Sequence, residues 1–141
     1  MFYKLFCGLS MMVVCSSVWC TTLQDNGDRT VTDLDTGRTW QQVDDDTTRN
    51  WKSALSYCDG LALGGKNDWR LPSPTELASI VVHQTDNPTI DEALYPSTNS
   101  SGYWSVSSMA GNNSQAWYVD FYYGPVDFSP KTKSHYVRCI R

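Results

Sequence analysis

Cys58 and Cys139 place the strongest restriction on how this chain can fold. They are the only cysteines after residue 20, because Cys7, Cys15 and Cys20 lie in the N-terminal segment. One pair of cysteines in an exported chain predicts a disulfide. The alternatives, half of a metal site or a redox pair, lack a partner histidine or a Cys-X-X-Cys spacing.

The sequence of residues 1–20 predicts a secretory signal peptide. Export would bring the chain into an oxidising compartment, where a disulfide can form. Lys4 gives a positively charged start, and the apolar run LFCGLSMMVVCSSVW is followed by polar TTLQDNGD. Cleavage is expected near Cys20, which leaves one domain over residues 21–141. A retained membrane anchor and a lipoprotein modified at Cys20 are the alternatives, although bulky Trp19 precedes that cysteine. The expected location is secreted, periplasmic or on the outer cell surface, without membrane insertion after signal removal.

Charge is distributed unevenly along the predicted mature chain. Removal of the signal peptide takes away Lys4 and no acidic residue. This leaves 10 basic and 15 acidic residues, a net charge of −5. Residues 21–60 hold eight aspartates, whereas residues 121–141 hold Lys131, Lys133, Arg138 and Arg141 against Asp127 alone. This pattern argues against nucleic acid as a partner and leaves room for one local anion-binding patch.

A β-hairpin is expected near the start of the mature chain. Thr30–Thr32 and Arg38–Gln41 alternate as strands do, and Asp33–Gly37 supplies turn residues between them. No cofactor is expected, but the run Asp25, Asn26, Gly27 and Asp28 leaves calcium as an alternative. An EF-hand loop needs a glutamate at its twelfth position, where this chain has Thr36.

Two short helices should follow. Trp51, Ala54, Leu55 and Cys58 recur at helical spacing, with Asn50 as N-cap and Gly60 as the C′ residue. The segment SPTE (residues 73–76) predicts a capping box, in which Ser73 and Glu76 satisfy each other's backbone N–H groups and Pro74 occupies the first helical position. Leu77, Ile80 and Val81 would form the inward stripe of that second helix.

The residues before the capping box are expected to be architectural. Pro72 forces the preceding residue into an extended conformation, and Trp69 should be a core aromatic. Arg70 is expected to pair with a buried carboxylate such as Asp120, with a ligand contact as the alternative.

The second half predicts a connector and then strands. Residues 83–102 form a long polar stretch, either a ligand-side loop or a tolerated insertion. YWSVS, AWYVDFYY, PVDFS and HYVRCIR are short, aromatic and β-branched, as strands of an antiparallel meander are. A hairpin, two helices and a meander make an α+β fold.

Several of these segments together resemble the Lcl C-terminal domain family, a bacterial family long catalogued as a domain of unknown function. The matching segments are DNGDRTVTDLDTGRTWQ, WKSALSYCDGLALGGKNDWRLPSPTELASIV, YWSVS, AWYVDF, Gly124 and YVRCIR, in the family's order. The resemblance implies a C-type-lectin-like fold in which a disulfide joins the first helix to the last strand, matching Cys58 and Cys139. The collagen-like adhesin that names the family is associated with sulfated glycosaminoglycans and attachment, and its Gly-rich stalk has no counterpart in this sequence.

The function expected from these features is a non-enzymatic binding or adhesion module for anionic glycans or protein partners. The alternative is a structural protein-interaction component of a bacterial envelope assembly. His83 and His135 lie in no recognisable catalytic or metal-ligand spacing, so no enzyme is expected. Tyrosines pack on sugar rings or protein at low entropic cost, and lysines hold anions. The candidate ligand surface is therefore Tyr122, Tyr123, Asp127, Phe128, Lys131, Lys133, His135 and Tyr136.

Overall fold

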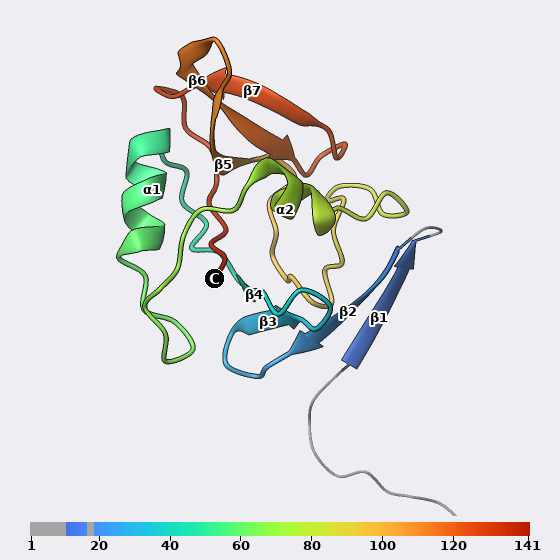
Figure 1. The fold of residues 1–141 in the computed structure, drawn as a ribbon. Coiled ribbons are helices and arrows are strands. Elements are labelled where there is room, and N and C mark those ends of the chain that lie inside the picture. Colours follow the sequence, from blue (N-terminus) through green and yellow to red (C-terminus); the bar gives the residue numbers. More distant parts are fainter. Residues whose placement is uncertain (1–10, 17–18) are drawn as a thin grey trace, which may run out of the picture.

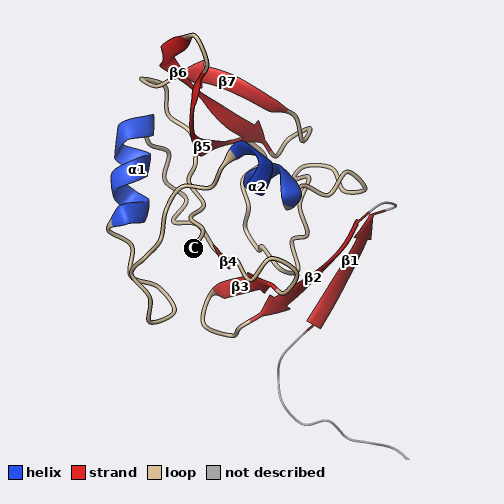
Figure 2. Cartoon of the chain, viewed as in Figure 1, coloured by secondary structure: helices blue, strands red, loops and turns tan. Residues whose placement is uncertain are grey.

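The computed structural model describes residues 11–16 and 19–141 as an α+β fold with two antiparallel sheets (Figures 1 and 2). The first sheet has the order β1-β2-β3-β4, formed by Met11–Ser16, Trp19–Asp25, Thr30–Asp33 and Thr39–Gln41. The second has the order β5-β6-β7, formed by Gly102–Met109, Asn112–Asp120 and Val126–Pro130. Helices α1 (Trp51–Asp59) and α2 (Pro74–Ser79) lie between the two sheets in the sequence. The predicted hairpin, the helix pair and the first three strands of the predicted meander are therefore confirmed.

The predicted signal peptide falls partly on residues 1–10 and 17–18, which lie outside the described residues. Met11–Ser16 forms β1, which pairs with β2. β2 also pairs with β3 through Leu23, Gln24 and Asp25, so cleavage near Cys20 would leave that second pairing in place. The signal peptide stays a prediction.

Both helices begin at the predicted caps. The Asn50 side chain accepts a hydrogen bond from the Ser53 N–H at 2.9 Å, and Ser73 and Glu76 form the complete capping box. The prediction for Gly60 is wrong in detail. Gly60 is the C-cap itself, with φ −90° and ψ −1°, rather than a left-handed residue after the cap.

The sheet β5-β6-β7 has a hydrophobic core on each face. Successive strand residues point to opposite faces, so Tyr103 packs in one core and Trp104 in the other. The first core adds Val31 and Trp40 of the hairpin and Leu77 of α2. The second contains Ala54 and Cys58 of α1, Trp69, Leu71 and Cys139. Trp69 is 3% exposed, as predicted.

The connector at residues 83–102 is part of this core. Ile90, Leu94 and Tyr95 are each 1% exposed and pack with the first cluster. A segment that supplies three core side chains is not a tolerated insertion, because its removal would open a cavity.

The prediction of a final regular strand at the C-terminus is wrong. Residues 135–140 run extended through the middle of the molecule and form isolated β-bridges in place of a regular strand. Ile140 bridges Trp40 on one side and Arg70 on the other, and Tyr136 bridges Tyr103. The Cys58–Cys139 disulfide, which is confirmed, joins α1 to this segment.

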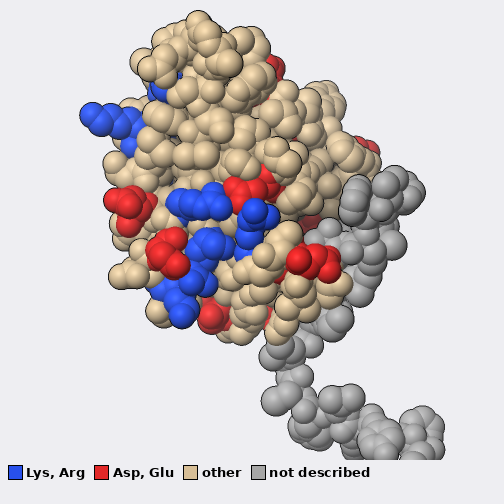
Figure 3. Space-filling view, viewed as in Figure 1, with Lys and Arg blue, Asp and Glu red and all other residues tan. Residues whose placement is uncertain are grey.

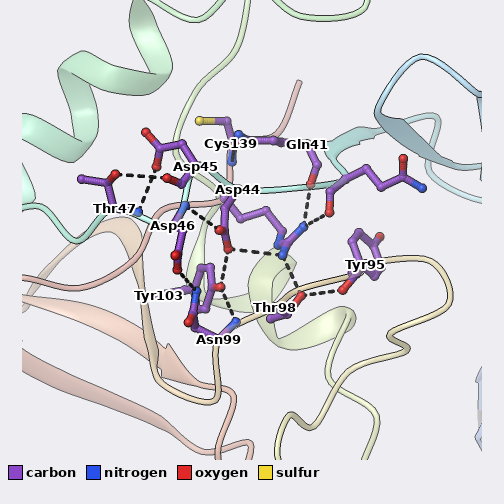
Figure 4. A network of polar contacts seen from close by, with 12 residues as sticks. Gln41, Asp44, Asp45, Asp46, Thr47, Tyr95, Thr98, Asn99, Tyr103 and Cys139 are labelled. Carbon is purple, nitrogen blue, oxygen red and sulfur yellow. Dashed lines mark hydrogen bonds and ion pairs between the residues drawn. The ribbon is translucent and has the colours of Figure 1, made fainter.

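Arg138 anchors the same segment inside the protein (Figure 4). Its side chain is fully buried, and it donates to the Gln41 carbonyl and the Thr98 hydroxyl, each at 2.8 Å. The Asp44 carboxylate lies 3.6 Å from its Nη2 atom and also accepts a hydrogen bond from the Tyr103 hydroxyl. Arg138 therefore cannot contribute to a basic surface, as the charge pattern of the C-terminal segment had suggested.

Removal of the disulfide should destabilise the fold strongly. The bond closes a loop with a sequence separation of 81 residues, worth about 4–5 kcal/mol in the chain-entropy model. We expect the Cys58→Ser/Cys139→Ser variant to lose several kcal/mol of unfolding free energy in urea denaturation. A loss under about 1 kcal/mol would contradict this role.

Breaking the buried ion pair should cost a comparable amount. Arg138→Met leaves the Asp44 carboxylate buried without its cation, which typically costs about 3–5 kcal/mol. The matched control is Arg38→Ala, which removes a cation whose side chain is 46% exposed and should cost about 1 kcal/mol or less. Equal losses in the two variants would show that Arg138 has no special role.

Candidate functional site

Glu76 of α2 brings together two arginines from distant parts of the sequence. Arg70 forms a two-point contact with it, with Nη1–Oε1 and Nη2–Oε2 distances of 2.9 Å. Arg38, from the end of the β3–β4 turn, places Nε 2.8 Å from Oε2 of the same carboxylate. The predicted pairing of Arg70 with Asp120 is therefore wrong, because Arg70 instead contacts the capping-box glutamate six residues later.

The position of Glu76 follows from its role in the helix cap. Its Oε1 atom accepts the Ser73 N–H at 2.8 Å, which holds the carboxylate beside the first turn of α2. The Arg70 guanidinium and, to a smaller extent, the Ser73 N–H lower the pKa of Glu76 from 4.5 to about 2, against the opposing effect of partial burial. The site therefore holds a permanent carboxylate flanked by two cations at neutral pH.

The two arginines keep much of their surface open to solvent. The side chains of Arg38 and Arg70 are 46% and 49% exposed, whereas that of Glu76 is 11% exposed. They line a cleft of about 1050 Å³ between the β3–β4 hairpin and α2, which we call the arginine cleft. Its other lining residues are apolar, hydroxylic or titratable: Asp33, Asp35, Thr36, Trp40, Ser73, Thr75, Glu76, Ala78, Ser79, Val81 and His83.

Further cations continue from the arginine cleft along the C-terminus. The backbone of Arg70 pairs with Ile140, which places Arg141 beside it, and Arg141 binds Asp68 through Nε–Oδ1 and Nη2–Oδ2 contacts of 2.5 and 3.0 Å. The hydrogen-bonded Arg141 guanidinium lowers the pKa of Asp68, and Lys66, which also lies near that carboxylate, adds a smaller effect in the same direction. Figure 3 shows Lys and Arg side chains gathered in the middle of this face, with carboxylates among and around them.

The acidic residues near the N-terminus serve turns. Asp25 accepts the Gly27 N–H, Asp28 accepts the Thr30 N–H, and Asn26 donates to Thr30 and Thr32. Within residues 11–16 and 19–141, no group of three or more His, Cys, Asp or Glu side chains is arranged to hold a metal ion.

The predicted ligand surface is spread over several places. Tyr122 and Tyr123 lie in the turn before β7, and Asp127 and Phe128 lie on β7. Lys131 and Lys133 follow its other end, and the five residues of β7 separate the two groups by roughly 16 Å. The tyrosines and lysines therefore do not meet in one patch.

Three of these residues make internal contacts. Lys131 Nζ donates to the Ser108 hydroxyl at 2.6 Å and lies 4.0 Å from the centroid of the Trp51 ring. His135 stacks on Tyr118 at 4.5 Å, and burial lowers its pKa. Tyr136 stacks on Tyr103 at 5.5 Å.

Comparison with known families decides the assignment. The family described as Lcl C-terminal domain matches residues 29–141, which is most of the chain. The chain belongs to the Lcl C-terminal domain family. Among proteins of curated function, none matches the sequence.

The matched region of this Lcl C-terminal domain contains both half-cystines and every residue of the arginine cleft. Sequence reasoning missed the cleft because Arg38 reaches Glu76 only through long-range packing of the hairpin on α2. The one available signal was local. Arg70 lies six residues before a glutamate whose position was already fixed by the cap.

No helix in the described part of the Lcl C-terminal domain chain is long and apolar enough to cross a membrane.

The pH dependence of stability should report the charge of Glu76. Because its pKa is lowered on folding, the carboxylate stabilises the fold above about pH 4.5, and this contribution is lost as the pH falls through about 2. We expect Glu76→Gln to reduce stability at pH 7 and to flatten the decline in unfolding free energy between these pH values. Parallel stability–pH curves for wild type and variant, measured by urea denaturation, would contradict the assigned pairing.

Proposed function

We propose that this protein is a non-enzymatic binding module of the cell surface or extracellular space that holds an anionic polysaccharide at the arginine cleft. The observation that carries the proposal is the arrangement of Arg38 and Arg70 on one carboxylate. Glu76 orients both guanidinium groups, yet about half of each side chain stays accessible. An arginine fixed in this way loses less conformational entropy when it binds a second oxyanion.

A polymer fits this surface better than a single small anion. The cations continue from Arg38 and Arg70 to Arg141 and Lys66, so successive acidic groups of one chain can contact successive cations. Four carboxylates, Glu76, Asp68, Asp33 and Asp35, lie among or beside these four cations, so the charges of this face are balanced. The attraction therefore rests on the orientation and exposure of the arginines and not on an excess of positive charge, and it should weaken as salt increases.

The proposed location rests on the disulfide. Disulfides persist in secreted, periplasmic and surface proteins and are rare in the cytosol of mesophiles. The Cys58–Cys139 bond joins two fully buried residues of the second core, as a structural disulfide does. An exported, surface-associated location provides the oxidising environment that the disulfide needs. It also agrees with the predicted signal peptide.

The fold is proposed to be C-type-lectin-like. The support is the family membership together with the link from the first helix to a C-terminal segment that runs beside the sheet. This relationship would place the arginine cleft on a scaffold used for ligand recognition.

The proposal predicts that Arg38→Ala weakens binding of dextran sulfate. Loss of one exposed ion-pairing cation should lower affinity about fivefold, equivalent to roughly 1 kcal/mol, and raising the salt concentration should weaken the wild type further. The measurement is isothermal titration calorimetry at two salt concentrations. The matched control is Lys131→Ala/Lys133→Ala, which removes two cations outside the cleft.

The two variants separate the possible sites. Loss of affinity in Arg38→Ala alone supports the cleft. Loss only in the lysine double variant would move the site to the meander. Absence of salt-sensitive binding in the wild type would end the proposal for an anionic polymer.

A further inference from the structure

Exposed apolar side chains are concentrated at the turn between β6 and β7. Among the described residues, six large hydrophobic side chains are exposed, and four of them lie within residues 122–128. Tyr123 is 74% exposed, and Tyr122, Val126 and Phe128 are 39–42% exposed. Such clustering on a small domain marks an interaction surface more often than scattered apolar residues do.

The strand register extends this cluster into a strip along one face of the sheet. Trp117 pairs with Phe128 and Val119 pairs with Val126, and directly opposed residues share a face. The rings of Trp117 and Phe128 meet edge to face at 5.7 Å. Gln115, opposite Pro130, places an amide at the far end of the same row. We call Trp117, Tyr122, Tyr123, Val126 and Phe128 the aromatic strip.

The aromatic strip carries no charge. Between Ala110 and Pro130 the sequence has no Lys, Arg or His, and Asp120 and Asp127 are its only charged residues. The carboxylates of both aspartates lie near Tyr118, on the face of the sheet opposite to the aromatic strip. Figure 3 likewise shows the lobe that holds β5–β7 almost free of Lys, Arg, Asp and Glu on the face in view. A strongly charged partner would therefore find no counter-charge on the strip.

The edge of β7 is closed to an added strand. Prolines precede and end the strand at positions 125 and 130, and proline cannot donate a hydrogen bond. The Phe128 N–H, which would face a new strand, already donates to the Asp127 carboxylate at 2.8 Å. A partner must therefore bind through the side chains of the strip and not through its backbone.

The tyrosines are held in position before any partner arrives. Gly124, at φ 93°, donates its N–H to the Asp120 carbonyl at 2.7 Å, and the Asp120 side chain accepts the Tyr122 N–H at 2.8 Å. Phe121 is fully buried and ties the turn to the core. A preorganised turn lowers the entropic cost of binding.

We propose that the aromatic strip binds a neutral polysaccharide through its own side chains. None of them lines the arginine cleft, although the turn at Gly124 packs against Val81 and His83 at one end of that cleft. The C–H faces of sugar rings carry slight positive charge and pack against the electron-rich faces of aromatic rings. Their hydroxyls can pair with the Gln115 amide and the tyrosine hydroxyls, so an uncharged strip with polar ends suits both parts of a sugar. An apolar protein surface would leave those polar groups unpaired, at a cost in binding free energy.

The test uses the intact protein and a soluble neutral β-glucan, laminarin, in 0.5 M salt, where contacts to the arginine cleft are screened. We expect binding, followed by tryptophan fluorescence and calorimetry, whose affinity does not change with salt. Phe128→Ser and Tyr123→Ser should each weaken it roughly tenfold, the factor that corresponds to 1.4 kcal/mol. The matched control is Leu34→Ser, because Leu34 is 47% exposed but lies in the β3–β4 turn.

Three results would overturn the proposal. They are no binding of laminarin by the wild type, equal weakening by Leu34→Ser, and self-association that Phe128→Ser abolishes in the absence of glucan binding. The last result would assign the strip to a second copy of the chain. Tyr123→Ser changes the most exposed ring, so a folding defect in one variant does not leave the question open. Dextran sulfate binding is measured in parallel, and because it depends on the arginine cleft, either site can fail alone.

Discussion

The buried cation of Arg138 is the constraint on which the rest of the structure depends. A fully buried guanidinium is costly unless it is paired. Here Gln41 and Thr98 accept hydrogen bonds from its two Nη atoms and Asp44 lies 3.6 Å away, whereas Nε has no hydrogen-bond partner among the described residues. These partners come from the hairpin, the connector and the segment before α1. The adjacent Cys139 is bound to Cys58 of α1. Two neighbouring residues thus fix the C-terminal segment to four separate parts of the chain.

The arginine cleft is a consequence of this arrangement. The fixed segment presents Ile140 between Trp40 and Arg70, which places the hairpin beside the strand-like chain that enters α2. Arg38 and Arg70 can then reach the same carboxylate, although 32 positions separate them in the sequence. The aromatic strip lies on the other sheet and carries no charge. In the two proposals made above, one small domain would offer a charged surface and a neutral surface to different parts of a polysaccharide.

Local patterns predicted the elements of the fold well. Asn50, Ser73 and Glu76 are caps whose chemistry acts within a few residues, and all three lie at helix starts in the structure. The contacts of Arg138 and Arg70 could not be predicted in this way, because each depends on partners brought close by tertiary packing.

The strand-like sequence HYVRCIR likewise suggested a regular strand. Its neighbours change from Arg49 to Tyr103 and then to Trp40 and Arg70, so no single ladder forms. The candidate ligand residues were adjacent in sequence, but β7 keeps their two halves apart.

The most direct test of the account is an NMR titration of isotopically labelled protein with a short sulfated oligosaccharide, following the arginine Nε–H and backbone amide signals. The account predicts that the largest shifts fall on Arg38 and Arg70, with smaller shifts at Arg141 and Lys66. The signals of Lys131 and Lys133 should stay in place. Shifts centred on Lys131–Tyr136, with the arginine signals unchanged, would contradict it.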